Sequence, residues 1–284
     1  LPDRNARHKI LSVHARSKPL SESVKLKELA SKTPGFSGAD LQNLLNEAAI
    51  YSARNNKLVI GPTELEKALE KARFGLLSKP LSDSTKKRQI SYQIIGKTLV
   101  ALLIPSQDKL EKISLFKSLS DISGMTYFTP DEETIDSGLI TRSYIYNKIV
   151  ILLGSRAAET IIFGANEITQ GSQKDLEEIY YWAHQMVTKF GFSELGPIAY
   201  DTQNDSIFLG RDIMQNKKEY SQETSKEIDK QIILIVNKAI NYAIDILSDK
   251  VPLMDTLVDE LLDKESLEAD YIINKVDSYL SAIK

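Results

Sequence analysis

Cysteine is absent from this 284-residue chain, and histidine is scarce. Without cysteine the chain can form neither a disulfide nor a thiolate zinc site. The three histidines, His8, His14 and His184, are few for metal binding or acid–base chemistry. A basic excess is also lacking, because the net charge is −3, so nucleic acid is not an expected partner. No continuous apolar run of about 18 residues occurs, so we expect no membrane-spanning helix within the sequence.

The sequence predicts a mostly α chain with a small β-sheet, in two domains. Its first residues, Leu1-Pro2-Asp3, resemble neither a start methionine nor a signal peptide, so we expect a piece of a longer protein. Residues 1–76 are expected to form a compact unit of four helices. A polar, proline-bearing segment at 77–88 is predicted to be a linker, and residues 89–284 a larger helical domain with the sheet.

Capping residues and apolar spacing predict the elements of the first unit. Helices are expected at 4–15 and 21–31, then from an N-cap at Ser37 to residue 55. Thr63, with Glu66 three residues later, predicts a capping box for a last helix that ends near residue 72.

The larger domain is expected to open with a buried helix at 90–104 that Pro105 ends. Two short strands should follow at 112–116 and 124–128. Further helices are predicted at 139–163, 175–190 (with Leu176 facing inward), 221–247, 252–263 and 268–281.

The first unit contains the motif Gly35-Phe-Ser-Gly-Ala-Asp-Leu41, with Ile10-Leu-Ser-Val-His14 before it and Asn46-Glu-Ala-Ala49 after it. This ordered set resembles the lid subdomain of AAA+ ATPases, and that of the FtsH branch in particular. It implies nucleotide contacts at His14, Gly38 and Ala39, since a helix start with small residues lets backbone N–H groups approach a ligand. The alternative is that Gly38 only begins a helix and that His14 is a packed core residue. Gly96-Lys97-Thr98 mimics the end of a phosphate-binding loop, but the first glycine and the preceding strand are missing.

The larger domain resembles the FtsH peptidase domain over its whole length. The matching segments include Tyr127-Phe-Thr-Pro-Asp-Glu132, Gly154-Ser-Arg-Ala-Ala-Glu159, Thr169-Gln-Gly-Ser-Gln-Lys-Asp-Leu176, Met186-Val-Thr-Lys-Phe-Gly191 and Phe208-Leu-Gly-Arg211. By this resemblance Arg142, Arg156 and Glu159 are expected to be structural ion-pair residues.

Members of that family carry His-Glu-x-x-His on the opening helix, where the two histidines and a distant aspartate hold zinc and the glutamate activates water. Here the aligned ligands are Gln93 and Lys97, the base is Ile94, and only Asp175 remains. A protonated lysine repels zinc, glutamine is a poor ligand and isoleucine accepts no proton. The resemblance therefore implies a proteolytically inactive member, with no zinc and no catalytic residue in this part.

Two further expectations concern what took over these positions. Lys97 should pair with Asp175, its ammonium replacing the charge of the metal; the alternative is that Lys97 extends to solvent and Asp175 lies on the surface. The strand residues Met125, Thr126, Tyr127 and Phe128 match the family's substrate edge, to which an extended peptide could add.

Taken together, the resemblance implies an ATP-driven unfoldase, translocation motor or assembly factor. It would form a hexameric ring with itself or with FtsH paralogues, handle protein clients and bind ATP and Mg²⁺ through an AAA core outside this chain. Transmembrane segments outside the chain would hold it at an organellar membrane, with the stromal side of the thylakoid or inner envelope of a chloroplast favoured. The alternative is a non-catalytic scaffold subunit in a ring with active FtsH subunits.

Overall fold

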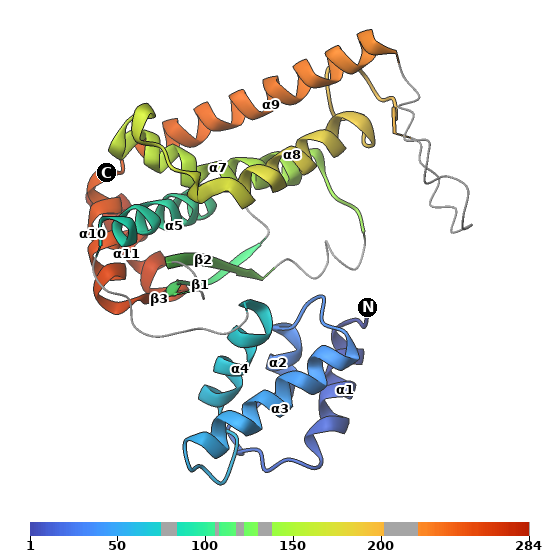
Figure 1. Ribbon diagram of the computed structural model, residues 1–284, viewed down its shortest axis with the longest axis vertical. Helices are drawn as coiled ribbons and strands as arrows, with labels where there is room; N and C mark the ends of the chain where they lie inside the picture. The colour runs from blue at the N-terminus through green and yellow to red at the C-terminus, as the bar shows by residue number, and fades with distance from the viewer. Residues whose placement is uncertain (75–83, 106–107, 118–121, 130–137, 202–220, 284) are drawn as a thin grey trace. The chain divides into compact units, whose positions relative to one another are not determined.

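The structure is a computed structural model that describes residues 1–74, 84–105, 108–117, 122–129, 138–201 and 221–283 (Figure 1). The segment 75–83, which holds most of the expected linker, and the segment Phe208-Leu-Gly-Arg211 lie outside these residues. Two compact units are present, the first built on Leu1–Ser82 and the second on Asp83–Leu115, Gly124–Phe128 and Leu139–Lys284. The described chain is mostly helical with one small sheet, as the sequence predicts.

The first unit contains four described helices around an apolar core. They are α1 (Arg4–Ala15), α2 (Leu26–Ser31), α3 (Gly38–Arg54) and α4 (Pro62–Phe74). The core is formed mainly by leucines at helical spacing on α1 and α3, which are Leu11, Leu41, Leu44 and Leu45, together with Ile60. Burial of these side chains supplies the main driving force for folding the unit.

Two helix starts in the first unit differ from expectation. The helix expected from residue 21 begins at Leu26, because Ser21 instead accepts a turn hydrogen bond from the Val24 N–H. The last helix begins at Pro62, which suits a first helical position, and not at a Thr63 cap. There Glu64 accepts a hydrogen bond from the Gly61 N–H. The expected N-cap at Ser37 is confirmed.

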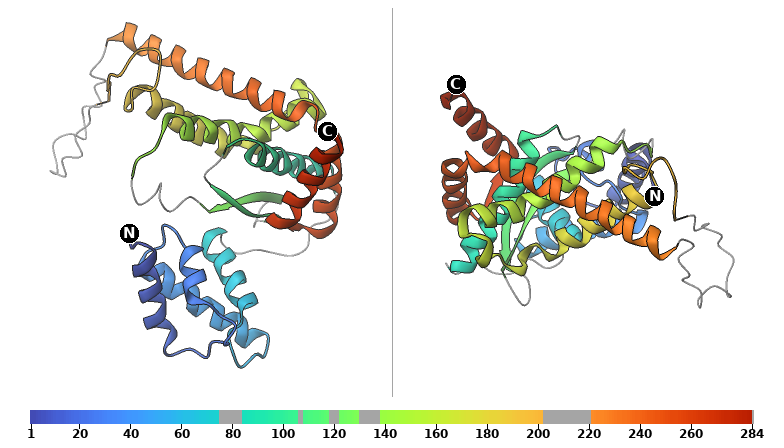
Figure 2. Two further views of the ribbon diagram at one scale, coloured as in Figure 1. Left: turned by 180° about the vertical axis from the view of Figure 1, so that it is seen from behind. Right: turned by 90° about the horizontal axis from the view of Figure 1, so that it is seen from above.

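The second unit is layered (Figures 1 and 2). Its described helices are α5 (Thr85–Leu103), α7 (Arg142–Phe163), α8 (Gln173–Thr188), α9 (Gln222–Ser248), α10 (Val251–Lys264) and α11 (Ala269–Ile283), with short 3-10 turns at Ala165–Glu167 and Gln170–Ser172. The sheet lies on one side of α5, α7 packs on the other side, and α8 and α9 cover α7.

The small sheet has the strand order β2-β1-β3. Strands β1 (Lys109–Lys117) and β2 (Ile122–Thr129) are longer than predicted. The third strand, β3 (Ser266–Glu268), was not predicted, and it pairs antiparallel with β1 so that Lys112 lies opposite Glu268. Residue 268, expected to start the last helix, therefore belongs to a strand. A pairing partner so distant in sequence is invisible to local pattern analysis.

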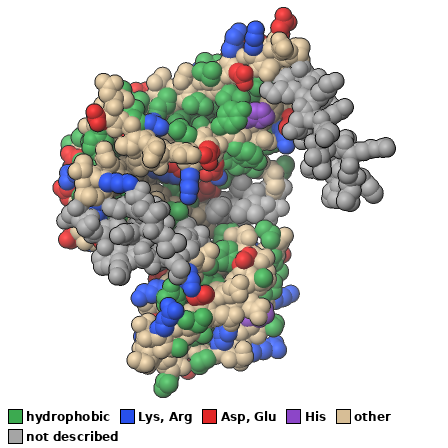
Figure 3. All heavy atoms as spheres, viewed as in Figure 1, with side chains coloured by type: hydrophobic (Ala, Val, Ile, Leu, Met, Phe, Trp, Pro, Cys, Tyr) green, Lys and Arg blue, Asp and Glu red, His purple; other side chains and the backbone are tan. Residues whose placement is uncertain are grey.

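Helix boundaries and faces in the second unit also shift. α5 begins at Thr85 because Ser84 caps it, within the end of the segment expected to be a linker. Leu176 is exposed, contrary to the expectation that it faces inward, and Tyr180 and Tyr181 join it on the surface of α8. Figure 3 shows hydrophobic side chains on the face where α8 and α9 lie.

Helix α9 bears on the expectation that no helix within the sequence spans a membrane. By length and composition alone it meets the criterion for a membrane span, with 22% of its apolar window buried. A helix that packs by one face inside a folded unit meets the same criterion, and α9 packs in this way on α7 and α8.

Candidate functional site

The three positions where the resemblance places zinc ligands and a base lie in the middle of α5, deep in the second unit. Gln93 and Ile94 are 7% and 5% exposed, and the Lys97 side chain is 18% exposed. Helix α5 reaches this depth because Gly96 lets it meet α7 closely: a Cβ at Gly96 would lie 2.5 Å from the carbonyl oxygen of Gly154. The Gly96-Lys97-Thr98 sequence is thus helix interior and not a phosphate-binding loop.

The residue before Gln93 anchors the opposite face of α5. The Tyr92 hydroxyl donates a 2.6 Å hydrogen bond to Asp255 on α10, and the Arg88 guanidinium lies over the Tyr92 ring. Burial, together with the bond to Asp255, raises the pKa of the Tyr92 phenol above its usual value. These contacts help set the rotation of α5 about its axis, in which Gln93 and, one turn later, Lys97 face residues of α7 and α8.

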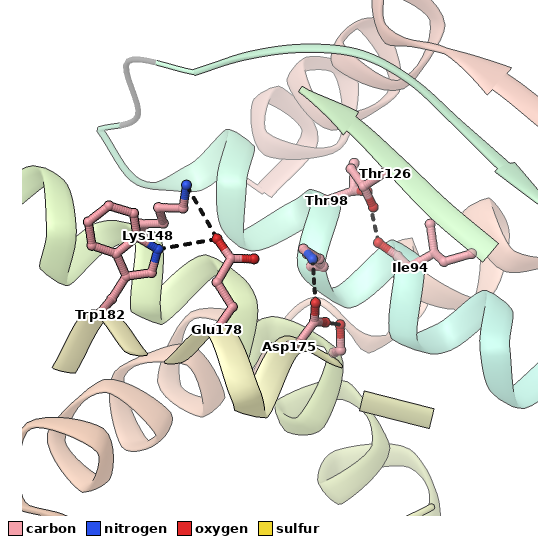
Figure 4. Close-up of polar contacts among 9 residues, drawn as sticks. Ile94, Thr98, Thr126, Lys148, Asp175, Glu178 and Trp182 are labelled. Atoms are coloured by element: carbon pink, nitrogen blue, oxygen red, sulfur yellow. Dashed lines mark hydrogen bonds and ion pairs between the residues drawn. The ribbon is translucent and has the colours of Figure 1, made fainter. Parts of the chain in front are cut away.

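Lys97 and Asp175 form the expected ion pair, with 2.8 Å between Nζ and Oδ1 (Figure 4). The second carboxylate oxygen, Oδ2, accepts a 3.1 Å hydrogen bond from the Ser155 hydroxyl on α7. Both charged side chains are about four-fifths buried, at 18% and 22% exposure. The predicted pair is therefore confirmed, and it joins α5, α7 and α8.

Gln93 lies in a second polar network on the same helices. Its amide Nε2 donates to Glu159 Oε1 at 2.8 Å and to Thr169 Oγ1 at 3.0 Å. The Thr169 hydroxyl also donates to Glu159 Oε1, at 2.6 Å. Glu159 is fully buried, and its Oε2 has no hydrogen-bond partner among the residues that the structure describes. The Gln93 amide is oriented with its NH₂ group toward Glu159 Oε1, because an amide NH₂ donates and a carboxyl oxygen accepts.

Of the three residues expected to form structural ion pairs, Glu159 has neutral partners among the described residues, and the expectation for Arg142 and Arg156 stays a prediction. Glu159 serves instead as the acceptor for a neutral amide and a hydroxyl.

Ile94, at the position of the base, packs under the strand β2. A Cβ built on Gly124 would lie 1.9 Å from Ile94 Cδ1 and 3.0 Å from Ile90 Cγ2. One turn further along α5, Thr98 Oγ1 lies 3.5 Å from Thr126 Oγ1 (Figure 4). The aligned base position is thus a packed apolar contact between helix and strand, with no group that can accept a proton from water.

The donor set does not fit zinc. Zinc in proteins takes thiolate, imidazole or carboxylate ligands, usually four in tetrahedral arrangement. Lys97 offers an ammonium with no lone pair, Gln93 has turned its NH₂ group to Glu159, and Asp175 is already bonded to Lys97 and Ser155. Within the described ranges no group of three or more histidine, aspartate or glutamate residues could hold a metal.

The predicted peptide-binding residues lie on a sheet edge. Met125, Thr126, Tyr127 and Phe128 belong to β2, which lies at one end of the described strand order. Tyr127 is 4% exposed and its ring faces Lys112 Nζ at 5.4 Å, so it helps hold β2 on β1. The other three are half-buried.

The predicted nucleotide residues lie in the first unit. His14 is half-buried near the end of α1, while Gly38 and Ala39 form the first turn of α3, a helix that packs on α1. Ser37 caps this turn by a capping box with Asp40, and that hydrogen bond lowers the pKa of the Asp40 carboxyl. A Cβ at Gly38 would meet no atom within 4 Å, so the start of α3 is open.

Ser155 and Thr169 were not singled out from the sequence, although they hold Asp175 and Glu159 in place. Both occur in segments that resemble the peptidase domain, Gly154-Ser-Arg-Ala-Ala-Glu159 and Thr169-Gln-Gly-Ser-Gln-Lys-Asp-Leu176. Each lies in the same segment as a carboxylate, Ser155 with Glu159 and Thr169 with Asp175, and this shared segment was the signal in the sequence that could have identified them.

Comparison with known proteins gives consistent matches in both units. Residues 80–274 match the model of peptidase family M41, and residues 23–67 match that of the AAA+ lid domain. The chain is 41% identical over 280 residues to the ATP-dependent zinc metalloprotease FtsH of Trieres chinensis, covering 98% of this chain and 43% of that protein. It is 41% identical to ATP-dependent zinc metalloprotease FtsH 3 of Synechocystis sp., with 95% and 44% covered. It is 38% identical to the chloroplastic ATP-dependent zinc metalloprotease FTSH 1 of Oryza sativa subsp. japonica, with 95% and 39% covered. The chain thus spans less than half the length of these relatives.

Proposed function

Because this chain belongs to peptidase family M41 and joins its peptidase part to an AAA+ lid, as FtsH-type proteins do, we propose that the full-length protein is a non-proteolytic, ATP-driven unfoldase, translocation motor or assembly factor. The protein would act on folded or membrane-associated client proteins in a ring with itself or with FtsH paralogues. ATP and Mg²⁺ would be bound by an AAA core outside the described residues, with His14, Gly38 and Ala39 contributing from the lid.

One observation carries the loss of proteolysis: the Lys97 ammonium lies 2.8 Å from the carboxylate of Asp175. A metal-dependent peptidase needs a Lewis acid and a base that activates water. Lys97 already neutralises the retained carboxylate, and Ile94 supplies a buried hydrocarbon where the base would be needed. Each change alone removes one requirement of the reaction, and both occur together.

What remains supports a role in handling clients. The edge of β2 can offer backbone N–H and C=O groups to an extended segment, and such pairing depends little on client sequence. The open start of α3 offers N–H groups where the resemblance places a nucleotide. A protein that binds and moves a client needs both of these features and does not need a cleavage site.

An organellar membrane, and a chloroplast membrane in particular, is the proposed location. Support comes from relatives whose names describe them as chloroplastic, from Oryza sativa and from Arabidopsis thaliana. Membrane attachment would come from transmembrane segments outside this chain.

The test uses the full-length protein with a folded fluorescent client that carries an unstructured tail. We expect ATP-dependent loss of fluorescence while the client stays at full length on a denaturing gel, with and without chelator. A proteolytically active FtsH from a relative, assayed in parallel, provides the positive control for cleavage. Client fragments that appear with ATP, whether or not a chelator abolishes them, would contradict the proposal.

The same experiment separates a motor from a scaffold subunit. A motor hydrolyses ATP when purified alone, and its rate rises when client is added. A scaffold subunit has no ATPase activity alone and is recovered in rings with active FtsH subunits. The scaffold role is the second candidate because the centre of α5 retains the packing of a peptidase domain without its donor groups.

A further inference from the structure

Two polar connections cross the centre of the second unit, and each joins the same parts of the fold. Lys97 on α5 reaches Asp175 on α8, which is bonded to Ser155 on α7. Gln93, one turn earlier on α5, reaches Glu159 on α7 and Thr169 in the turn before α8. A bound metal ion joins helices in the same way, since its ligands come from different elements and its binding energy contributes to folding.

The charge of Asp175 is balanced without a metal. Asp175 is about four-fifths buried, and a carboxylate at that depth needs a counter-charge or several hydrogen bonds. Lys97 supplies the counter-charge through Oδ1 and Ser155 supplies a hydrogen bond to Oδ2. A divalent cation bound to Asp175 would lie within a few ångströms of the ammonium, and the two positive charges would repel each other.

Gln93 explains why Glu159 stays in place. A metal-binding histidine usually donates its second N–H to a carboxylate behind it. The Gln93 amide donates an N–H to Glu159 at 2.8 Å, so the buried carboxylate keeps a donor although no imidazole is present. Gly171 leaves room for this amide, because a Cβ there would lie 2.4 Å from Gln93 Nε2.

From these contacts we infer that Lys97 is the permanent cation of this centre and that the Lys97–Asp175–Ser155 connection does the structural work of a metal ion. The second unit is therefore held together independently of any divalent cation. This inference goes beyond the proposed function, because it concerns the stability and cation preference of the unit and requires neither a ring nor ATP.

The first test measures metal content and thermal unfolding of the full 284-residue chain. We expect well below one equivalent of zinc after purification without chelator. The unfolding temperature of the second unit should change by less than about 1 °C in excess EDTA or in a small excess of zinc, since no cation binds the folded state preferentially. Stoichiometric zinc, or a clear fall in unfolding temperature with EDTA, would overturn the inference.

The second test is a double-mutant cycle on the pair. Lys97→Met removes the cation and leaves the carboxylate buried, so the unfolding temperature of the second unit should fall by about 4–10 °C. Asp175→Asn should also lower the unfolding temperature of the second unit. The double variant should lose clearly less than the sum of the two single decreases. Additive decreases in unfolding temperature would show that Lys97 and Asp175 do not depend on each other and would overturn the inference.

Lys230→Met is the matched control, since Lys230 pairs with Glu227 on the surface of α9 at 69% and 48% exposure. Exposed ion pairs contribute little to stability, so the unfolding temperature of the Lys230→Met variant should stay within about 2 °C of that of the parent chain. A loss for Lys97→Met no larger than this control would also overturn the inference. Failure of the proposed function is distinguishable, because cleavage of a client by a metal-free protein would contradict that function and leave this inference intact.

Discussion

The start of α3 in the first unit and the middle of α5 in the second are both glycine-bearing positions that family resemblance marks as functional, and the structure treats them in opposite ways. Around Gly38 there is open space and an exposed Ala39, with Ser37 capping the helix. At Gly96 a Cβ would clash with α7, and at Gly124 on β2 a Cβ would clash with the Ile94 side chain of α5. The contrast teaches that a glycine at a position marked by the same family resemblance can leave open space at a helix start or allow two helices to pack closely.

The largest effect on stability is expected where α5 crosses α7. Gly96→Ala places a Cβ 2.4 Å from Ala158 Cβ and 2.5 Å from the Gly154 carbonyl oxygen, and neither of these atoms can rotate away. We expect the second unit to lose about 3 kcal/mol or more in free energy of unfolding, measured by urea denaturation. Gly38→Ala is the control: its Cβ meets nothing, so the first unit should be unchanged or more stable by up to about 1 kcal/mol. Equal losses of unfolding free energy for Gly96→Ala and Gly38→Ala would show that the two glycines do not differ in how closely they are packed.

An intermediate effect is expected where Ile94 meets the strand. Gly124→Ala would push a methyl into Ile94 Cδ1, the end of a flexible side chain, at a cost of about 1–3 kcal/mol. Ile94→Val removes that methyl group and alone should cost about 1 kcal/mol. Combined, the two changes should destabilise the second unit by less than the sum of their separate effects, as judged by urea denaturation. Strict additivity would mean that Ile94 does not fill the space beneath β2.

The smallest effect on stability is expected at one ion pair of the first unit, Lys57–Glu64, which can be compared with Lys97–Asp175. Lys57 Nζ lies 2.7 Å from Glu64 Oε1, and this hydrogen bond lowers the pKa of the Glu64 carboxyl from its usual 4.5. Since the folded-state pKa is the lower one, the stabilisation is complete above about pH 4.5 and is lost as pH falls through the folded-state value.

Glu64→Gln should therefore lower the free energy of unfolding of the first unit near pH 7 by about 1 kcal/mol or less, since Lys57 is half-exposed. Below the lowered pKa the variant and the parent should become equally stable. Denaturation curves between pH 2.5 and 7 measure this. A difference that persists unchanged at the acid end would show that the carboxylate charge is not its source.

The same two regions show which features local pattern could predict. Ser37 is a capping residue followed by Asp40 and an apolar helix, so the start of α3 follows from neighbours a few residues away. The start of α4 was misplaced at Thr63 because Pro62 and the Glu64–Gly61 hydrogen bond compete with that cap, and only the folded turn decides between them. The strand β3 was missed because three residues carry too little pattern, and they form a strand only where β1 offers them a partner.

At the centre of the second unit, residue identities alone established which donor groups are missing. Gln93 and Lys97 cannot supply imidazole and Ile94 cannot accept a proton in any fold, and the shortage of histidine and the lack of cysteine leave no substitute ligand. The ion pair with Asp175 could also be predicted, because a buried carboxylate needs a counter-charge. Glu159 was misjudged, because its donor is a neutral amide that reaches it only after α5 and α7 have packed.

The sequence by itself therefore determined the helical fold class, the family and which functional groups stand at the positions aligned with the zinc ligands and the base, because these depend on apolar spacing and on the kinds of residue present. Only the tertiary structure decided what fills the vacated positions. Ser155, Thr169 and Gly124 come from segments far from α5, and their contacts with Asp175, Gln93 and Ile94 exist only once the helices and strand are packed together.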